Sequence, residues 1–425
     1  MTTDPYWWQA AVPVAPTVKP LPSQIEVLVI GSGYTGLSAA LTLARGGREV
    51  LVLDRAKIGE GASTRNAGMM SGNLKLSLAE LTRRYGAHTA RAIYKEGIQA
   101  RAYIHSLIDE EKIECQRAPT GLLTPATNPR HYEALSRSAD ELHRELGIST
   151  YALPQQELGS EIGSELFFGG VVNDEVWSFH PGLYHRGLVK TAVAAGVALQ
   201  DKTEVTRLVR EDKKLLVTTP RGCISAGSVV VATNGYTTPG LPWWQHRVVP
   251  IRGRIAATAP IGNNMMAQLL PNNRVVVESN RLFHYFRPSP DGTRLLVGGR
   301  YGGSEKNPAL GLKRFRTRLG QVFPALADVE FEHDWHGFTA FTRDLLPHIG
   351  VHAGVHYALG FCGSGIVWGT WLGRKVALKI LRDEEAVTSF DRTLPGIPLY
   401  TGRPWFLPPV MGWFAFRDKL DLYSR

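Results

Sequence analysis

Apolar positions near the start of the chain follow two periods, first that of a strand and then that of a helix. Residues 25–30 form an apolar run interrupted only by Glu26, which is typical of a buried strand in a parallel sheet. Apolar residues then recur at helical spacing at Leu37, Ala40, Leu41 and Ala44. A second apolar run over residues 50–53 ends at Asp54. The pattern therefore predicts a strand–helix–strand unit with parallel strands.

The rest of the chain alternates between the same two patterns. Helical periodicity extends over residues 77–111, 129–146, 181–196 and 313–323, and over the segment that ends at Ile380. Short apolar or alternating runs predict strands over residues 197–209, 214–219, 226–232 and 357–361. Residues 243–334 alternate in polarity, which favours an antiparallel sheet with one polar face. We therefore expect an α/β protein that combines a parallel sheet with an antiparallel one.

The turn between the first strand and the first helix carries glycines at the spacing GxGxxG. Gly31 permits the tight turn, Gly33 lets a pyrophosphate approach the backbone, and Gly36 lets the helix pack closely on the strand. The helix N-terminus offers free N–H groups to a phosphate, and Asp54 follows where a carboxylate can accept from ribose hydroxyls. A purely structural turn is the alternative, but strand, helix, second strand and acid all follow in order. The unit therefore predicts a dinucleotide site.

Composition and charge narrow the class of protein further. A chain of 425 residues with 44% hydrophobic content is long enough for two or three domains. The net charge of +10 is compatible with acidic partners or anionic lipid, but no basic run or nucleic-acid module supports a nucleic-acid partner. The three cysteines lack CxxC or metal-ligand spacing, so we expect no metal site and a reducing compartment. Without a membrane-spanning stretch or a secretion signal, the expected location is the cytoplasm.

Residues 59–68, GEGASTRNAG, follow the second strand and decide which dinucleotide we expect. This string resembles a loop of the D-amino-acid-oxidase-like (glycine/sarcosine oxidase) family of FAD-dependent enzymes. The strings VATNGY at 231–236 and GFCGSG at 360–365 are similar to strings of the same family. The alternative for residues 59–68 is an ordinary surface loop whose arginine holds an anion. The resemblance extends over nearly the whole chain after residue 25, and it implies FAD as the cofactor.

The resemblance also implies which part of FAD each string contacts. It places Ala62 and Ser63 at the pyrophosphate, residues 65–69 beside the flavin, and the backbone of Val205 at the adenine. The helix that begins at GFCGSG would direct its positive end toward the flavin ring and stabilise the negative charge of the reduced ring. The glycine motif and the resemblance together assign FAD binding to Gly31, Ser32, Gly33, Tyr34, Thr35, Gly36, Asp54, Arg55, Gly61, Ala62, Ser63, Arg65, Asn66, Ala67, Gly68, Met69, Val205, Thr233, Asn234, Gly235, Gly337, Gly363, Ser364, Gly365 and Ile366.

In domain terms, the resemblance implies a two-part Rossmann-like FAD-binding domain and a substrate domain built from an antiparallel β-sheet plus helices. We expect the FAD-binding domain over residues 25–115, 180–242 and 335–390, and the substrate domain over residues 116–179 and 243–334. Residues 391–425 form a tail beyond these domains. Trp413, Phe416 and Leu420 share one helical face of this tail. That face predicts either a cap packed on the protein or a peripheral contact with the inner face of the cytoplasmic membrane.

The reaction implied by the resemblance is oxidation of a C–N bond. The order of strings is most similar to that of gamma-glutamylputrescine oxidoreductases and related small-amine enzymes. In such enzymes an amine passes hydride to flavin N5, and the resulting imine is hydrolysed. We expect an oxidase that uses dioxygen. The alternatives are a dehydrogenase that passes electrons to a quinone or another carrier, for example from a cyclic imino acid such as pipecolate, and a non-catalytic or RNA-modifying flavoprotein.

Two positions depart from the sarcosine-type pattern. Gly337 stands where those relatives carry a flavin-linked cysteine, so we expect non-covalent FAD. Val367 stands where they carry a carboxylate-binding lysine, so the substrate needs another cation. Candidate cations are Arg252, Arg254, Arg287 and Arg300, and candidates to orient an amine are His284, Tyr285 and Tyr301. We expect the catalytic residues to be Arg65, Tyr285, His284 and Arg287.

Overall fold

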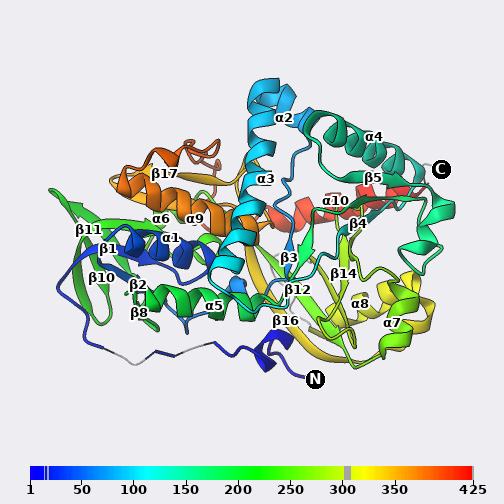
Figure 1. Cartoon of the computed structure of the whole chain (residues 1–425), viewed down its shortest axis with the longest axis horizontal. Helices are drawn as coiled ribbons and strands as arrows, with labels where there is room; N and C mark the ends of the chain where they lie inside the picture. Colours follow the sequence, from blue (N-terminus) through cyan, green and yellow to red (C-terminus); the bar gives the residue numbers. More distant parts are fainter. Residues whose placement is uncertain (14, 17–18, 301–307, 424–425) are drawn as a thin grey trace.

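The computed structural model describes residues 1–13, 15–16, 19–300 and 308–423, and it is built around two eight-stranded sheets (Figure 1). The first sheet has the central order β17-β18-β11-β1-β2-β8. Its strands are β1 (Gln24–Ile30), β2 (Val50–Leu53), β8 (Ala198–Gln200), β11 (Gly222–Val231), β18 (Val355–Leu359) and β17 (His348–His352). The first five of these pair in parallel, as the buried apolar runs predict. A hairpin of β9 (Arg207–Glu211) and β10 (Lys214–Thr219) adds to β11.

Helices cover one face of this first sheet. Those nearest the sheet are α1 (Tyr34–Arg45), α5 (Pro181–Ala194) and α9 (Gly365–Leu381), while α3 (Ala87–Glu110) packs on α9 and α2 (Leu78–Tyr85) packs on α3. Their apolar faces share one core with β1 and β2, in which Val29, Leu37 and Leu372 are buried. The close packing of α1 against α9 depends on small residues, because a Cβ on Gly373 would lie 2.4 Å from the carbonyl O of Thr35. This packing holds the N-termini of α1 and α9 near each other.

The second sheet has the order β16-β12-β15-β14-β13-β4-β6-β5 and is antiparallel except where β13 meets β4. Its strands are β16 (Phe331–Phe341), β12 (Val249–Thr258), β15 (Leu295–Arg300), β14 (His284–Pro288), β13 (Val275–Val277), β4 (Leu122–Pro125), β6 (Gly170–Asn173) and β5 (Thr150–Leu153). Helices α4 (Pro129–Leu146), α7 (Asn263–Leu269) and α8 (Pro308–Val322) accompany this sheet. The shorter elements are β3 (Met69–Met70), β7 (Trp177–Ser178) and α6 (Pro242–Gln245), and α10 (Leu407–Tyr423) lies in the tail.

The structure corrects two predicted elements. The helix expected over residues 77–111 is two helices, because Gly86 adopts φ +83° between α2 and α3. The single strand expected over residues 197–209 is wrong: β8 pairs with β2 and β9 pairs with β10, at different places in the sheet. The range 335–390, expected in one domain, contains residues of both sheets, since β16 up to Phe341 pairs with β12.

The first residues of the chain form an arm whose tryptophans anchor it on the body of the protein. Trp7 is fully buried, and its indole Nε1 donates to the carbonyl O of Asn66 at 2.9 Å. Trp8 Nε1 donates to Thr64 Oγ1, also at 2.9 Å. Both contacts are made to the segment 59–68, so the arm helps to fix that loop. Among the helices that the structure describes, none is long and apolar enough to cross a bilayer.

Candidate active site

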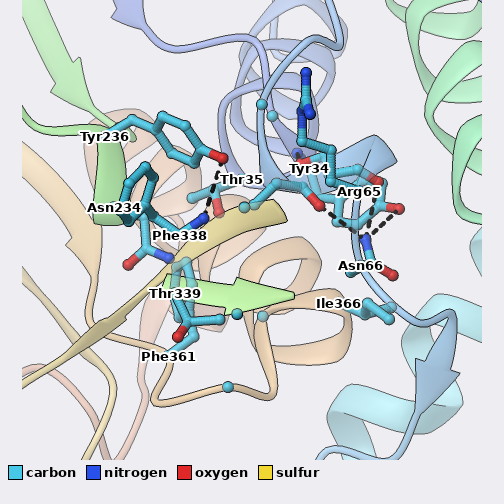
Figure 2. A pocket seen from close by; sticks show the side chains of 18 of the residues that line it. Tyr34, Thr35, Arg65, Asn66, Asn234, Tyr236, Phe338, Thr339, Phe361 and Ile366 are labelled. Atoms are coloured by element: carbon cyan, nitrogen blue, oxygen red, sulfur yellow. Dashed lines mark hydrogen bonds between the residues drawn. The ribbon is translucent and has the colours of Figure 1, made fainter. Parts of the chain in front are cut away.

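A cavity of about 650 Å³ lies between the two sheets. Its wall comes from the turn after β1, from the loop 59–67, from the start of α9 and from strands β12, β14, β15 and β16. Figure 2 shows side chains from α1, from the turn before α9 and from β16 around this space. Segments separated by more than 300 positions in the chain therefore form one site.

The first glycine turn fits a dinucleotide phosphate. Gly31 has φ +106°, and a Cβ there would lie 3.0 Å from the carbonyl O of Ala232. A Cβ on Gly36 would lie only 1.8 Å from the carbonyl O of Gly31, so the helix can lie this close to the turn only without a side chain. No side chain projects from Gly33, where α1 begins at the cavity. The helix N-terminus is therefore open to an anionic group.

Asp54 at the end of β2 fixes the shape of this turn. Its Oδ2 accepts from the N–H of Ser32 at 2.8 Å and from the Ser32 hydroxyl at 2.6 Å. Its Oδ1 accepts from the N–H of Ala56 at 3.0 Å. Asp54 also borders the cavity, so the carboxylate ties β2 to the glycine turn at the place expected for a ribose.

Asn66 organises the loop 59–68 from within. Its Nδ2 donates to the carbonyl oxygens of Ala62 at 3.1 Å and Ser63 at 2.9 Å, and to the Tyr34 hydroxyl at 3.2 Å. Its Oδ1 accepts from the N–H of Gly68 at 2.8 Å. The Ser63 hydroxyl in turn accepts from the N–H of Tyr34 at 3.0 Å. The loop is therefore bonded directly to the first turn of α1.

Arg287 supports the same loop from the second sheet. It is buried, and its Nη1 donates to the carbonyl oxygens of Ala67 at 2.9 Å, Gly68 at 3.2 Å and Phe179 at 3.0 Å. Burial lowers the pKa of its guanidinium to about 10, so it remains charged at neutral pH. The side chain acts on the loop backbone and does not border the cavity.

The turn between β18 and α9 forms the opposite wall of the site. Gly363 has φ +101°, and no side chain caps the first turn of α9 at Ser364. Asn234, at the end of β11, accepts from the N–H of Gly360 at 2.9 Å and joins the two segments. Cys362 is buried against Thr342, and burial raises the pKa of its thiol. Both α1 and α9 thus begin at the cavity and direct positive dipole ends toward it.

Arg65 borders the cavity but makes its contacts at the rim. Its Nε donates to the carbonyl O of Glu60 at 2.7 Å, and its guanidinium stacks on the Trp8 ring at 4.5 Å. In Figure 2 its side chain extends away from Phe361 and Ile366. The Arg65 carbonyl accepts from Trp335 Nε1 at 2.8 Å. The side chain therefore links the loop to the arm.

The candidate residues of the second sheet differ in their placement. Arg254 forms a buried ion pair with Asp334, with Nε and Oδ1 2.6 Å apart. His284 Nδ1 lies 3.3 Å from Glu278 and outside the cavity wall. Tyr285 borders the cavity, and burial raises the pKa of its hydroxyl. Tyr301 lies outside the described residues.

Most residues assigned to the site from sequence border this cavity. The exceptions among the described residues, which do not border it, are Gly36, Gly68, Gly235, Arg252, Arg254, His284 and Arg287. Gly36 and Arg287 shape that wall through the backbone contacts described above. The structure also adds cavity residues that sequence reasoning missed, namely Lys75, Phe283, His336 and Phe361.

Lys75 and Arg300 are the cations at the end of the cavity next to Gly363. A Cβ on Gly363 would lie 2.6 Å from Arg300 Nη2 and 3.7 Å from Lys75 Cε. The Arg300 guanidinium lies 4.8 Å from the ring centres of Phe283 and Phe341. Among the described residues, no carboxylate pairs with Lys75 or Arg300. This end of the cavity is therefore aromatic and positively charged.

The environment of Lys75 perturbs its titration. Lys75 is accessible through the cavity, yet protein surrounds it, and the loss of water lowers its pKa to about 7 with a further contribution from Arg300. Burial also lowers the pKa of Arg300, to about 10. No motif in the sequence identifies Lys75 as a site residue. Only the fold brings it to Gly363.

The chain is similar to known proteins over most of its length. The model of the FAD-dependent oxidoreductase family matches residues 26–378. The gamma-glutamylputrescine oxidoreductase of Escherichia coli is 28% identical over 93% of each chain. The "Probable oxidoreductase OrdL" of Haemophilus influenzae is 30% identical over 86% of this chain and 85% of its own. The crystal structure of glycine oxidase from Geobacillus kaustophilus has the same fold, with a TM-score of 0.74 at 23% identity, over 90% of this chain and 99% of that chain.

Proposed function

The chain belongs to the family of FAD-dependent oxidoreductases, and from this premise we propose that it oxidises a C–N bond of a small amine that carries an anionic group. FAD is accordingly its cofactor. When bound, FAD supplies a two-electron oxidant that takes hydride at N5 from the carbon beside the nitrogen, leaving an imine that water hydrolyses. Two relatives are named for the oxidation of glycine and of gamma-glutamylputrescine, which supports an amine or amino-acid derivative as substrate.

The residues proposed to hold FAD are those of the two glycine turns and the loop 59–68. The open N-terminus of α1, with Ser63 beside it, suits the pyrophosphate, and Asp54 and Val205 border the part of the cavity expected for the adenosine. The α9 N-terminus suits the flavin, whose reduced ring carries negative charge. We propose that FAD is bound non-covalently, since Gly337 offers no side chain for attachment. Denaturing the holoprotein in acid should then release the flavin into the supernatant.

The environment of Arg300 is the observation on which the proposed anionic group of the substrate rests. A guanidinium stripped of water needs a counter-charge, and no described carboxylate supplies one. Lys75 adds a second donor at the same end, and Phe283 and Phe361 provide apolar walls that exclude water. A carboxylate between these donors would orient the molecule and leave its amine in the rest of the cavity. The proposed substrate is thus an amine with a carboxylate, rather than a simple diamine.

An anaerobic screen read by flavin bleaching tests this function. The panel would pair each amino acid, N-methyl amino acid, cyclic imino acid and polyamine derivative with its carboxamide. We expect the carboxylates to bleach the flavin faster, and Arg300→Met to lower kcat/KM for them by roughly a hundredfold or more, because removing one partner of a buried ion pair costs about 3–5 kcal/mol. For the carboxamides the variant should change little. Arg207→Met, on the exposed edge of β9, is the matched control.

Three outcomes would contradict the proposal. If no amine in the panel bleaches the flavin, the proposed oxidation of an amine is wrong. If Arg300→Met loses the same fraction of its rate with the carboxylates as with the carboxamides, Arg300 does not bind the anionic group. If Arg300→Met keeps its flavin and its kinetics with the carboxylate substrates are unchanged, another cation binds the anionic group.

For the electron acceptor we propose dioxygen, so that hydrogen peroxide should form in step with the imine product. The second candidate is a dehydrogenase that reduces a quinone or another carrier, and it is favoured by the apolar surface of the tail. Measuring peroxide against product, with and without a soluble quinone, distinguishes them. If neither peroxide nor product forms in air, and product forms once the quinone is added, the dehydrogenase is favoured.

A further inference from the structure

Helix α10 presents large apolar side chains on the surface. Trp413 is 55% exposed and Phe416 is 51% exposed, and Trp405 just before the helix is 63% exposed. The opposite side of α10 packs on the protein through Leu407, which is buried. Figure 1 shows α10 in red, running beside the second sheet toward the edge of the molecule marked C. The match to the family model ends at residue 378, before this helix begins.

The charges of α10 are divided between its two sides. Asp418 faces the protein, where it accepts from the N–H of Arg281 at 3.1 Å and of Leu282 at 2.9 Å. Asp421 pairs with the Arg281 guanidinium at 2.5 Å, and this pairing lowers the pKa of its carboxyl. These are the acids of the described part of the helix, and both pair with Arg281, which supplies one positive charge for the two carboxylates. The acids of α10 therefore lie on the side of the helix that faces Arg281.

The exposed charged residues on the outward side are cations. Arg403, Arg417 and Lys419 are exposed, and the Arg417 guanidinium lies 5.7 Å from the Trp413 ring. The surface thus combines aromatic side chains with cations, and the two acids of residues 403–421, Asp418 and Asp421, are partly exposed and pair with Arg281. We name this surface, made by Trp405, Trp413, Phe416, Arg417 and Lys419, the tail face.

We propose that the tail face docks on an anionic lipid bilayer. Tryptophan and phenylalanine side chains are favoured at the level of the lipid headgroups, and exposed cations are attracted to anionic lipids. A helix that lies in the membrane plane needs this combination and no spanning segment. A second copy of the chain is a poorer occupant, because a two-fold contact would place Arg417 and Lys419 of both copies in one interface. The net charge of +10 adds to the attraction.

Vesicle flotation with the full-length holoprotein tests this proposal. We expect the protein to float with vesicles of phosphatidylcholine and phosphatidylglycerol and not with phosphatidylcholine alone. The variant Trp413→Ser/Phe416→Ser keeps every charge. Its partition coefficient onto the anionic vesicles should fall by roughly tenfold or more, because both large apolar side chains are removed from the interface. Arg417→Glu/Lys419→Glu should lose binding to the anionic vesicles. Val193→Ser, an equally exposed apolar position on α5, is the matched control and should bind as the wild type does.

The outcomes against the proposal are distinct. A wild type that does not float with anionic vesicles overturns it. Unchanged binding of Trp413→Ser/Phe416→Ser also overturns it, since attraction would then come from net charge alone. A wild type that is dimeric without lipid, and becomes monomeric in the same variant, assigns the tail face to a second copy. Unchanged flavin absorbance and circular dichroism of each variant show that a loss of flotation is not a loss of fold.

Discussion

Replacing Asn66 by alanine tests whether the loop 59–68 is held ready for FAD before FAD binds. The side chain makes four hydrogen bonds, to Ala62, Ser63, Tyr34 and Gly68. At about 0.5–1.5 kcal/mol net for each bond, with one N–H shared between acceptors, the loop loses about 2–4 kcal/mol of local stability. FAD must then order the loop as it binds, so this cost is subtracted from its affinity. The dissociation constant should rise by roughly 30- to 700-fold.

Fluorescence titration of apoprotein with FAD measures this change directly. The melting temperature supplies an independent readout, because a ligand that binds more weakly stabilises the native state less. The apoprotein of Asn66→Ala should melt close to the wild type, since the loop opens locally, whereas the holoprotein should melt lower. Asn264→Ala, at an exposed position on α7, is the matched control. A dissociation constant for Asn66→Ala within about threefold of the wild type would refute the reasoning.

Three further predictions concern other parts of the site. Gly33→Val and Ser63→Arg should each abolish FAD retention, since a Cβ on Gly33 would already lie 2.9 Å from Ser63 Oγ; either variant purified with normal flavin absorbance would contradict the assignment. Lys75 has a folded-state pKa of about 7, below the value of 10.5 expected when unfolded, so between these pH values the unfolded chain binds the extra proton and stability rises with pH. In Lys75→Met the rise in urea midpoint between neutral and alkaline pH should be smaller than in the wild type, and an identical rise would exclude the shift. Asp418→Ala removes the acceptor for Leu282 N–H beside Phe283, so KM should increase while FAD content stays normal; an unchanged KM would show that α10 does not position this wall.

The dinucleotide unit was predictable from sequence because its physics is local. A buried parallel strand, a turn that needs Gly31 at positive φ and a helix that needs Gly36 against the turn all lie within a few residues of one another. The same holds for the turn at Gly363 and the start of α9. Strand partners were less predictable: residues 197–209 were expected to form one strand, yet β8 and β9 within this range pair with different strands. Pairing depends on which edge is available, and a single run of sequence does not contain that information.

By itself the sequence determined the first glycine turn and a dinucleotide as the class of cofactor, because steric demands on neighbouring residues leave few alternatives. The resemblance of its strings to a known family added the loop 59–68, the second glycine turn and FAD. Only the tertiary structure decided which cations meet in the cavity. Arg252, Arg254, Arg287 and Arg300 are equal candidates on paper, but Arg254 is neutralised by Asp334 and Arg287 holds the loop backbone. Lys75 and Arg300, 225 positions apart, come together at Gly363 through packing of the second sheet against α9. The charge of a site depends on long-range neighbours and on lost water, which are properties of the folded chain.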